Sequence, residues 1–543
     1  CESYRLRYLL VKRTDQRLIA DGQGPLAPRL KEVLLVFKFI AKRLGISAVI
    51  MLISSAIMYI LTINSGDPLK DLRESTDPNR DNLIAQRTQW MGLDQPWYTR
   101  YWDWLTGVGG CFKGQCDLGI NRSGQSVNHM LGLAVSSTMR LVVLATVLAI
   151  VLGIFFGMMT AIRQYSGFDY TVTFAAFVFY SLPAFVFAVL LKEYGAIRFN
   201  NWLRDPTISL VTSLIIAALF ALFIQAMLAG NKKRRLISFG VTFAVLVAVL
   251  QFMSATGFMN DPTIGIWLPL GVGVVAAILF TSLFTGTSNK RTLYNTLGSA
   301  VIAVLLLQIF EGQLWEPTWG FLFILLVGFV AIAVALGYFT GGYARRSVIW
   351  ANVWTVCSVW MACLMDFMMR YWSDYTSLSS GRPISTIGSE TPNFRGGDVF
   401  WLQFTDLATH LLLPTISLTL MSIASYTRYT RSAMLEVLNQ DYVRTARAKG
   451  LPEHTVITRH AFRNAMIPIT TIIAFDFAGL IGGAVITETV FGWKGMGNMF
   501  KVALDQVDPA PVMAFFLVTG GAAILMNMLA DITYAYIDPR IRR

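Results

Sequence analysis

Few residues in this chain have the types and spacing that catalysis or metal binding requires. The four histidines never occur at the HExxH spacing of a zinc site. The chain also lacks the phosphate-binding GxxxxGK[ST] motif and the nucleophilic GxSxG motif. The histidines are His129, His410, His454 and His460. These patterns argue against a hydrolase or a nucleotide-binding enzyme, and we expect no cofactor or metal bound by this chain.

Two cysteines are close enough for a local bond. Cys111 and Cys116, in the sequence CFKGQC, lie in a polar stretch predicted to be outside, where a disulfide could persist. A zinc pair is the alternative, although no third or fourth ligand lies nearby. Cys1 could carry a lipid outside the membrane, but the basic run from Lys31 to Arg43 places that end inside. A processed or truncated terminus is therefore expected at Cys1.

Ionisable residues are rare within the apolar runs: Asp366, Asp476 and Asp531. Ion-coupled carriers need charged or broken-helix sites near the middle of the membrane. Asp476 is the candidate for such a site, but it could equally face a water-filled pathway or cap a neighbouring helix. A stand-alone secondary carrier or channel that uses Asp476 therefore remains a rival hypothesis.

The composition indicates a polytopic membrane protein. Of the 543 residues, 55% are hydrophobic and 14% are charged, far fewer charges than soluble domains carry. The formal net charge is +13. Because most Lys and Arg residues lie in short loops on one side, this charge indicates membrane topology and does not indicate nucleic-acid binding.

Twelve apolar runs are predicted to span the membrane, with both termini inside. They lie near residues 44–63, 139–162, 170–191, 207–229, 236–256, 264–285, 296–310, 318–340, 347–369, 408–427, 466–487 and 512–535. The run at 296–310 is short for a span. Residues 64–136 and 370–407 form external loops. Four tryptophans of the first loop could form an interfacial belt or a small core: Trp90, Trp97, Trp102 and Trp104.

A polar segment interrupts the apolar C-terminal half. Residues 428–464 contain seven Lys or Arg residues and three acids, which predicts a cytoplasmic position. Asp441 is a candidate helix N-cap, Gly450 would end that helix, and Pro452 suits the first turn of the next. Cations near the helix end are Arg444, Arg447 and Lys449. This shape suggests a surface for a soluble partner. The alternative is a basic loop on anionic lipid, which would favour a strong apolar face.

Several motifs resemble the oligopeptide/dipeptide permease family, and specifically the first of the two membrane permeases of ATP-binding-cassette importers. The resemblance covers about 33–200 and 400–543. Its motifs are Cys116-Asp-Leu-Gly119, Ser137-Thr-Met-Arg-Leu141, Gly167-Phe-Asp169 through Ser181-Leu-Pro183, His410-Leu-Leu-Leu-Pro414, Asp441-Tyr-Val-Arg-Thr-Ala-Arg-Ala-Lys-Gly450, Arg459-His-Ala-Phe-Arg-Asn464, Gly482 through Phe491 and Asp538-Pro-Arg-Ile-Arg542.

The resemblance implies an all-α polytopic protein with a six-helix type I importer core and about six inserted helices. The implied regions are a cytoplasmic tail (1–32), the first half of the core (33–206), an inserted transmembrane block (207–369) and the second half of the core (370–543). Family members of ordinary length lack the 207–369 block. It could surround the core as a lipid-facing annulus, bind another subunit or form part of an altered pathway.

By the same resemblance, residues 428–465 are the coupling segment, the EAA loop, which contacts an ATPase. The fixed glycine of that pattern corresponds to Gly450 and its small residue to Ala446, while Arg444 and Thr445 replace the general glutamate and first alanine. The implied ATPase-docking residues are Asp441, Arg444, Ala446, Arg447, Lys449, Gly450 and Pro452.

The resemblance implies a non-enzymatic, multi-pass permease of the plasma membrane. Its implied partners are a second homologous permease, two ATPase domains that bind ATP and Mg, an extracellular binding protein, membrane lipid and a peptide substrate, with no nucleic acid. Relatives also import nickel complexes, glutathione or oligosaccharides. A scaffold that binds the ATPase without transport is a further alternative.

The implied substrate pathway runs along the spans near 172–190 and 466–486. Its candidate lining residues are Pro183, Asp476 and Gly479. One external motif departs from the family pattern, because Lys494 stands where the Phe-x-Trp-Pro-Gly-Met-Gly sequence has proline.

Overall fold

The computed structural model describes residues 27–227, 231–286, 289–392, 394, 397, 399–451 and 453–537. Side chains at 27–40, 530–537 and a few single positions are outside this description. Cys1, Pro452, most of the predicted 1–32 tail and the last six residues, 538–543, therefore lie outside the described residues. The described part is helical, with a lone bridge between Ile120 and Ser126 and no strand. The predicted all-α class is confirmed.

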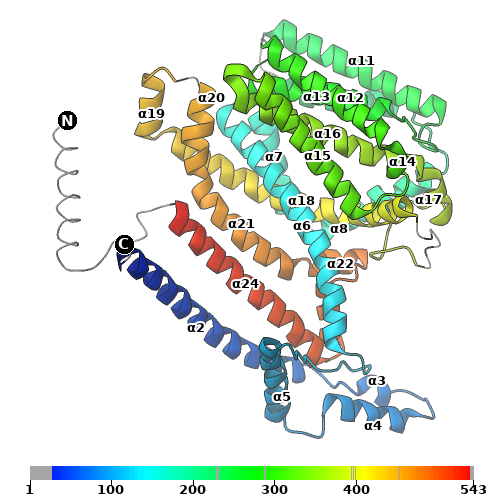
Figure 1. Cartoon of the computed structure of the whole chain (residues 1–543). Coiled ribbons are helices and arrows are strands. Elements are labelled where there is room, and N and C mark those ends of the chain that lie inside the picture. The colour runs from blue at the N-terminus through cyan, green and yellow to red at the C-terminus, as the bar shows by residue number, and fades with distance from the viewer. Residues whose placement is uncertain are drawn as a thin grey trace, which may run out of the picture. The chain divides into compact units, whose positions relative to one another are not determined.

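The chain divides into two compact units. The first contains the described residues up to Thr138, together with Met466–Val485 and the residues from Gly495 onward. In it, α2 (Ala27–Ile63) and α24 (Pro509–Ile537) run side by side (Figure 1). Its shorter helices are α3 (Lys70–Arg73), α4 (Arg80–Met91), α5 (Trp97–Gly110), η1 (Cys111–Lys113) and α23 (Met496–Asp505).

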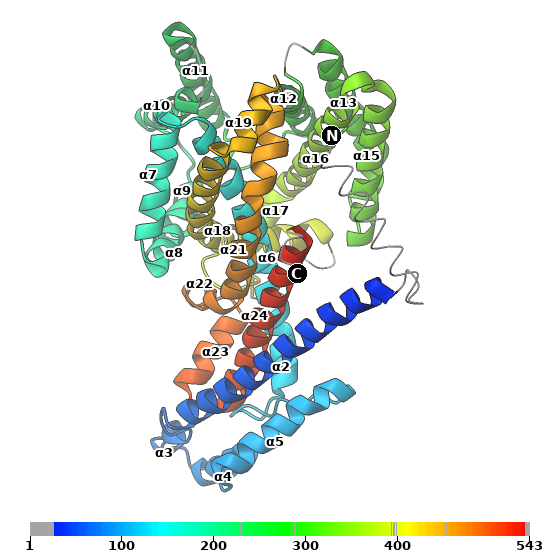
Figure 2. The same cartoon turned by 90° about the vertical axis from the view of Figure 1, so that its left-hand side faces the viewer.

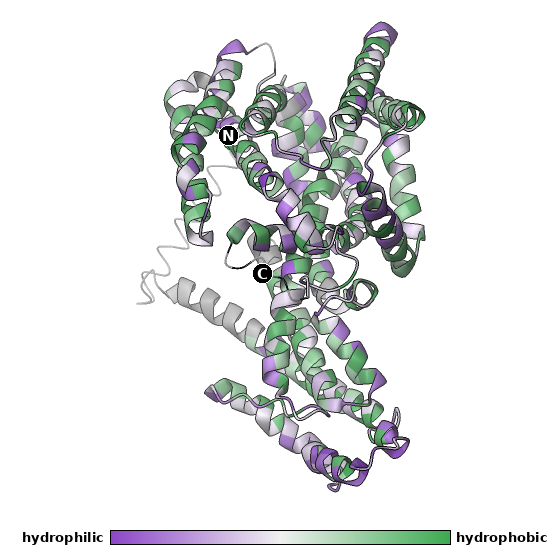
Figure 3. Cartoon of the chain, turned by 90° about the vertical axis from the view of Figure 1, so that its right-hand side faces the viewer, coloured by the Kyte–Doolittle hydropathy of each residue, from purple (hydrophilic) through white to green (hydrophobic). Residues whose placement is uncertain are grey.

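The predicted external loop 64–136 is anchored to both long helices of this unit. The hydroxyls of Tyr101 in α5 and Ser55 in α2 are 2.8 Å apart. The backbone N–H of Arg122 donates to the carboxylate of Asp508, just before α24, at 2.7 Å. Burial raises the pKa of Asp508, and this hydrogen bond opposes the rise. The α3–α4 segment is largely hydrophilic (Figure 3).

The tryptophans of this loop do not form a buried core. Trp90, Trp97 and Trp102 are exposed, whereas Trp104 is half-buried and lies 6.1 Å from the ring of Tyr101. Their exposure favours the interfacial belt over the small core.

The second unit comprises Met139–Ala465 and Ile486–Lys494. A sharp bend interrupts its predicted span at 170–191, which is not one straight helix. α7 (Gly167–Ser181) and the stretch Ala184–Leu203, which begins with α8 (Ala184–Lys192), meet at 102°. Leu182 adopts extended backbone because a residue that precedes proline is sterically excluded from the helical region. A π-helical turn (Glu193–Arg198) and α9 (Phe199–Leu203) follow α8.

Two glycines bring α6 (Val127–Ile162) against α18 (Phe400–Leu438) within the second unit. A Cβ placed on Gly153 would lie 2.5 Å from Cβ of Tyr426, and one on Gly157 would lie 2.5 Å from Cβ of Thr430. The four-residue spacing places both glycines on one face of α6. This is the small-xxx-small pattern by which membrane helices approach closely.

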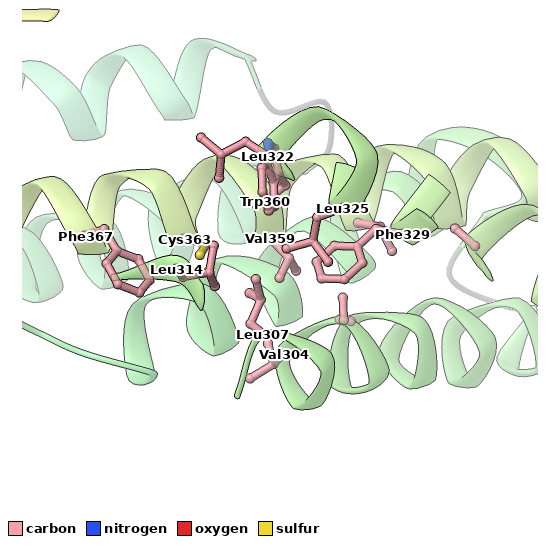
Figure 4. Packing of buried hydrophobic residues seen from close by; sticks show 14 of the residues in the cluster. Val304, Leu307, Leu314, Leu322, Leu325, Phe329, Val359, Trp360, Cys363 and Phe367 are labelled. Atoms are coloured by element: carbon pink, nitrogen blue, oxygen red, sulfur yellow. The ribbon is translucent and has the colours of Figure 1, made fainter. Parts of the chain in front are cut away.

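Four helices of the 207–369 block form a bundle: α12 (Trp267–Phe284), α13 (Lys290–Ile309), α15 (Trp319–Thr340) and α16 (Arg345–Arg370). Side chains such as Leu307, Leu325 and Val359 converge between the helices (Figure 4). Trp401 of α18 completes this core. Its indole N–H donates to the Leu314 carbonyl at 2.7 Å, and its ring stacks on Phe367 with centroids 4.9 Å apart. The bundle is therefore bound to α18.

The remaining helices of the block form a pair. α10 (Leu210–Met227) and α11 (Lys232–Thr256) lie beside each other (Figure 2), and α10 also contacts α7. No residue in the most apolar stretch of α11 is buried by other described residues, which suits a lipid-facing helix. The short elements of the second unit are α14 (Glu311–Leu314), η3 (Gly342–Ala344) and α17 (Trp372–Leu378).

Among the described residues, nine helices are long and apolar enough to cross a membrane, and the bent α7–α8 pair raises the number to ten. The short predicted run at 296–310 belongs to α13, which begins at Lys290 and has 20 residues, enough to span. The predicted span at 207–229 corresponds to α10, whose apolar part, Leu210–Ala226, is shorter than a full span. The predicted span at 466–487 largely coincides with α21 (Arg463–Gly483). The total of twelve stays a prediction.

Gly157→Ala tests the close approach of α6 and α18. We expect it to lower stability by about 1–3 kcal/mol, because the new methyl group meets Thr430 and the backbone carbonyl of Thr427. Gly240→Ala, on α11, is the control, because its Cβ would meet nothing within 4 Å. Thermal unfolding of the detergent-solubilised chain measures the difference. Equal stability of the two variants would contradict the packing argument.

Candidate functional site

The polar segment at 428–464 begins inside a helix. α18 continues without a break for 39 residues to Leu438, so residues 428–438 extend the preceding span and are not a loop. The apolar-to-polar change in sequence marks where the helix leaves the apolar layer, and it does not mark where the helix ends. The predicted coupling segment is thus attached directly to a long helix.

The first predicted short helix is α19 (Asp441–Ala448). Gln440 holds the N-cap position, with no side-chain cap, and Asp441 is the first helical residue, so the prediction of Asp441 as N-cap is wrong. The carboxylate at that position still suits the positive end of the helix. Gly450 ends the helix as predicted, with φ of +73° and its N–H donating to the Arg447 carbonyl at 2.9 Å.

One face of α19 is packed against the chain itself. Val443 is fully buried and Ala446 is 6% exposed, and both pack against Val456, Val437 and Leu438. The implied ATPase-docking role of Ala446 stays a prediction. The small side chain of Ala446 lets α19 approach its own support.

The opposite face of α19 is exposed and cationic. Arg444, Arg447 and Lys449 all lie in it. Arg447 forms an ion pair with Glu453 at 2.8 Å, and this hydrogen bond lowers the pKa of the Glu453 carboxyl. A carboxylate oxygen of Asp441 lies 3.8 Å from a guanidinium nitrogen of Arg444, and the Asp441 side chain is almost fully exposed. Such exposed pairs contribute little stability, so these cations remain available for another charged surface.

The second predicted helix has an unusual form. α20 (Glu453–Thr455) leads into a π-helical segment, Val456–Phe462, which continues into α21 at Arg463. Ala461 of the π-helical segment is buried with Met434 of α18 and Ala161 of α6. The π-helical segment therefore contacts α19 through Val456 and two long helices through Ala461. Such segments often occur at functional sites.

A buried ion pair stabilises the base of this site. Arg431 of α18 donates from Nε and Nη2 to the two carboxylate oxygens of Asp169, both at 3.0 Å. Asp169 is 2% exposed and also accepts from the N–H of Tyr165. Sequence reasoning missed this pair. Gly167-Phe-Asp169 belongs to a motif of the family resemblance, but nothing in a single sequence reveals a partner 262 positions away.

The predicted pathway residues lie in different units. Pro183 is exposed at the bend between α7 and α8 in the second unit. Asp476 is half-buried and Gly479 is exposed on the part of α21 that belongs to the first unit. Their role as a pathway lining stays a prediction. Asp366, another ionisable residue singled out in the sequence, forms an ion pair with Arg370 at 2.9 Å.

Cys111 and Cys116 are joined by a disulfide. Because a disulfide leaves no thiolate, these two cysteines cannot serve as the zinc pair considered from the sequence. Within the described residues, no group of three or more His, Cys, Asp or Glu side chains could hold a metal ion.

Comparison with known proteins identifies the family. A family model described as the inner membrane component of binding-protein-dependent transport systems matches residues 153–543, which is more than half of the chain. The chain belongs to this family. A model of the N-terminal part of such components matches residues 36–147 of the permease. Together with its apolar helices, this places the permease among multi-pass membrane proteins of transport systems.

Individual relatives match shorter segments of the permease. The oligopeptide transport system permease protein OppB of Mycobacterium tuberculosis (strain H37Rv) is 41% identical over 155 residues, which is 28% of this chain and 47% of the relative. The dipeptide transport system permease protein DppB of Escherichia coli (strain K12) is 45% identical over 140 residues, or 26% and 41%. The matched segments thus span less than half of each relative.

Ala446→Leu tests the inward packing of α19. We expect the larger side chain to displace α19 from Val456, which would lower stability by about 1–3 kcal/mol and increase proteolysis at the segment. Ala448→Leu is the matched control, because Ala448 lies on the same helix and is exposed. Limited proteolysis and thermal unfolding of the purified permease provide the measurement. A greater effect from Ala448→Leu would show that the two faces are assigned in reverse.

Asp169→Asn tests the buried ion pair. The change leaves Arg431 without its carboxylate, and we expect a loss of about 3 kcal/mol in stability. Asp441→Asn removes a carboxylate that is almost fully exposed and should change stability by less than about 0.5 kcal/mol. Denaturation of both variants in the same detergent compares them, and similar midpoints would refute a structural role for Asp169.

Proposed function

We infer that this permease is the transmembrane subunit of an ATP-driven importer of di- or oligopeptides, and that it forms half of the translocation pathway. The observation that carries the proposal is α19. One face is fixed by apolar packing to the permease, and the other presents cations to solvent. A helix held in this way suits the transfer of movement from a soluble partner.

Family membership and the names of the relatives support the remaining parts of the proposal. The proposed partners are a second homologous permease, two ATPase domains and an extracellular substrate-binding protein. ATP and Mg are bound and ATP is hydrolysed by the ATPase subunits, so this chain needs no catalytic residues. Because the relatives named above transport oligopeptides or dipeptides, peptides are the proposed substrate class. Nickel complexes, glutathione and oligosaccharides are alternative solutes.

The proposed coupling runs through rigid contacts. Closure of the ATPase pair would move α19 through its exposed cations. Because Val443 and Ala446 pack against Val456 and Leu438, that displacement reaches the π-helical segment and the end of α18 together. The Asp169–Arg431 ion pair would transmit this displacement from α18 to α7. A rigid-body change between inward and outward access is the expected result.

The proposed topology places α19 in the cytoplasm and the disulfide-bonded loop outside the plasma membrane, with both termini inside. The alternation of basic loops supports this orientation. The 207–369 block is proposed to be an insertion between the third and fourth core spans. Its four-helix bundle has a buried core of its own and its α11 is exposed, which favours a position in the membrane at the lipid-facing edge of the permease core.

The double variant Arg444→Glu/Lys449→Glu tests ATPase docking. Reversing both exposed cations should reduce recovery of the ATPase subunits in co-purification about tenfold or more and abolish peptide uptake, because like charges at an interface oppose association. Membrane insertion should be unchanged.

Lys232→Glu/Lys233→Glu is the matched control, since these two exposed cations start α11 on the same predicted side of the membrane. It should retain the ATPase and uptake. Normal ATPase recovery and uptake in the α19 double variant would refute the proposed docking site. Co-purification of the whole complex with its ligand would distinguish peptides from the alternative solutes.

A further inference from the structure

The second unit contains an open cavity of about 1110 Å³ that the coupling mechanism does not use. It lies among loop residues 387–392 and 394, Arg140 of α6, the first turns of α15 and α18, and the segment 492–494. The predicted topology places the loop at the external face of the membrane, where the predicted spans 139–162 and 318–340 begin. Its volume is of the size that binds small molecules.

The wall of this cavity is fixed by backbone contacts. The N–H of Gly388 donates to the Phe491 carbonyl at 2.8 Å. Gly492 adopts φ of +57°, and a Cβ there would lie 2.7 Å from the Cγ2 atom of Ile387. The loop and the 492–494 segment are therefore held together, so the cavity has a defined shape.

One side of the cavity is aromatic. The ring of Trp319 lies 5.1 Å from Phe400 and 5.7 Å from Phe404, measured between centroids. Trp319 is 61% exposed although it is large and apolar. It belongs to the 207–369 block, so that block supplies part of the cavity wall. Such a cluster can bind an aromatic or aliphatic side chain.

The cavity also carries charges of both signs. Arg140 is exposed and has no hydrogen-bond or ion-pair partner within the described chain. Lys494 and Glu390 are 3.3 Å apart, and their side chains are 70% and 69% exposed. An exposed pair of this kind is weak and can exchange partners. Asp406 is committed to its own fold, because it accepts hydrogen bonds from Tyr375 and Thr391.

We propose that this cavity is a binding site for a short zwitterionic peptide with an apolar side chain. Arg140 and Lys494 would bind the carboxylate, Glu390 the ammonium group, and Trp319 with Phe404 the apolar side chain. The inference rests on the proposed function and adds to it a binding site on the permease itself.

Two departures from the family pattern meet in this cavity. By the resemblance, Lys494 stands where the external motif has proline, and Trp319 belongs to the proposed 207–369 insertion. An anionic lipid headgroup is a poorer match, because the acidic Glu390 lies among the bases. A peptide with free termini and an apolar side chain can contact the bases, the acid and the aromatic wall at the same time.

Direct binding to the full-length permease in nanodiscs tests the site, with phenylalanyl-alanine as the probe. The probe should bind saturably, and a form acetylated at its N-terminus and amidated at its C-terminus should bind about tenfold more weakly or worse, because it lacks both charges. Arg140→Gln and Trp319→Ala should each raise the dissociation constant about tenfold.

Matched controls exclude general damage. Arg382→Gln changes an exposed arginine of the 370–407 loop that does not line the cavity, and Trp267→Ala changes a tryptophan 71% exposed at the start of α12. Both should bind the probe as the unaltered permease does. Equal binding of the blocked and free dipeptides, or no effect from Arg140→Gln and Trp319→Ala, would overturn the site.

Uptake of labelled dipeptide by cells with the whole transporter separates the two proposals. If uptake occurs and the permease alone binds no probe, the cavity proposal fails and the import function stands. If the probe binds as expected without any uptake, the import function fails and the site remains. If Trp319→Ala impairs uptake while direct binding is normal, the cavity is a docking surface for a partner protein and the peptide site is refuted.

Discussion

The close packing of α6 against α18 is the constraint on which the rest of the second unit depends. Gly153 and Gly157 leave no room for a side chain between the two helices. In a membrane, where lipid is as apolar as the helices, such shape complementarity is what holds helices together. α18 also carries Trp401 into the core of the 207–369 block, and Arg431 toward Asp169. The position of α18 therefore sets the positions of the bundle, the ion pair and α19.

Much of the fold follows from local sequence signals. Apolar runs predicted the helices because every backbone polar group in lipid must be satisfied within its own helix. Gly450 predicted a helix end because glycine readily adopts positive φ. Hydropathy did not predict helix ends, however. α13 begins among polar residues at Lys290, and α18 continues past Arg428, since a helix need not stop where the membrane does.

The candidate site was predictable in its location and not in its orientation. The cations of residues 441–449 identified the segment, but which face of α19 is buried depends on Val456, in another element. The inward packing of Ala446 is therefore visible only in the structure. The Asp169–Arg431 pair and the cavity beside Trp319 join residues far apart in sequence, and periodicity in one chain contains no information about such pairs.

The tight α6–α18 contact has a consequence for how the permease can move. Because Gly153 and Gly157 let the two helices pack with almost no space between their backbones, α6 and α18 are expected to move together as one rigid body. Flexibility must then come from places where the helical hydrogen-bond ladder is already broken. The bend at Leu182-Pro183 is such a place, since proline donates no hydrogen bond there. The bend is therefore where α8 can pivot relative to the paired helices α6 and α18.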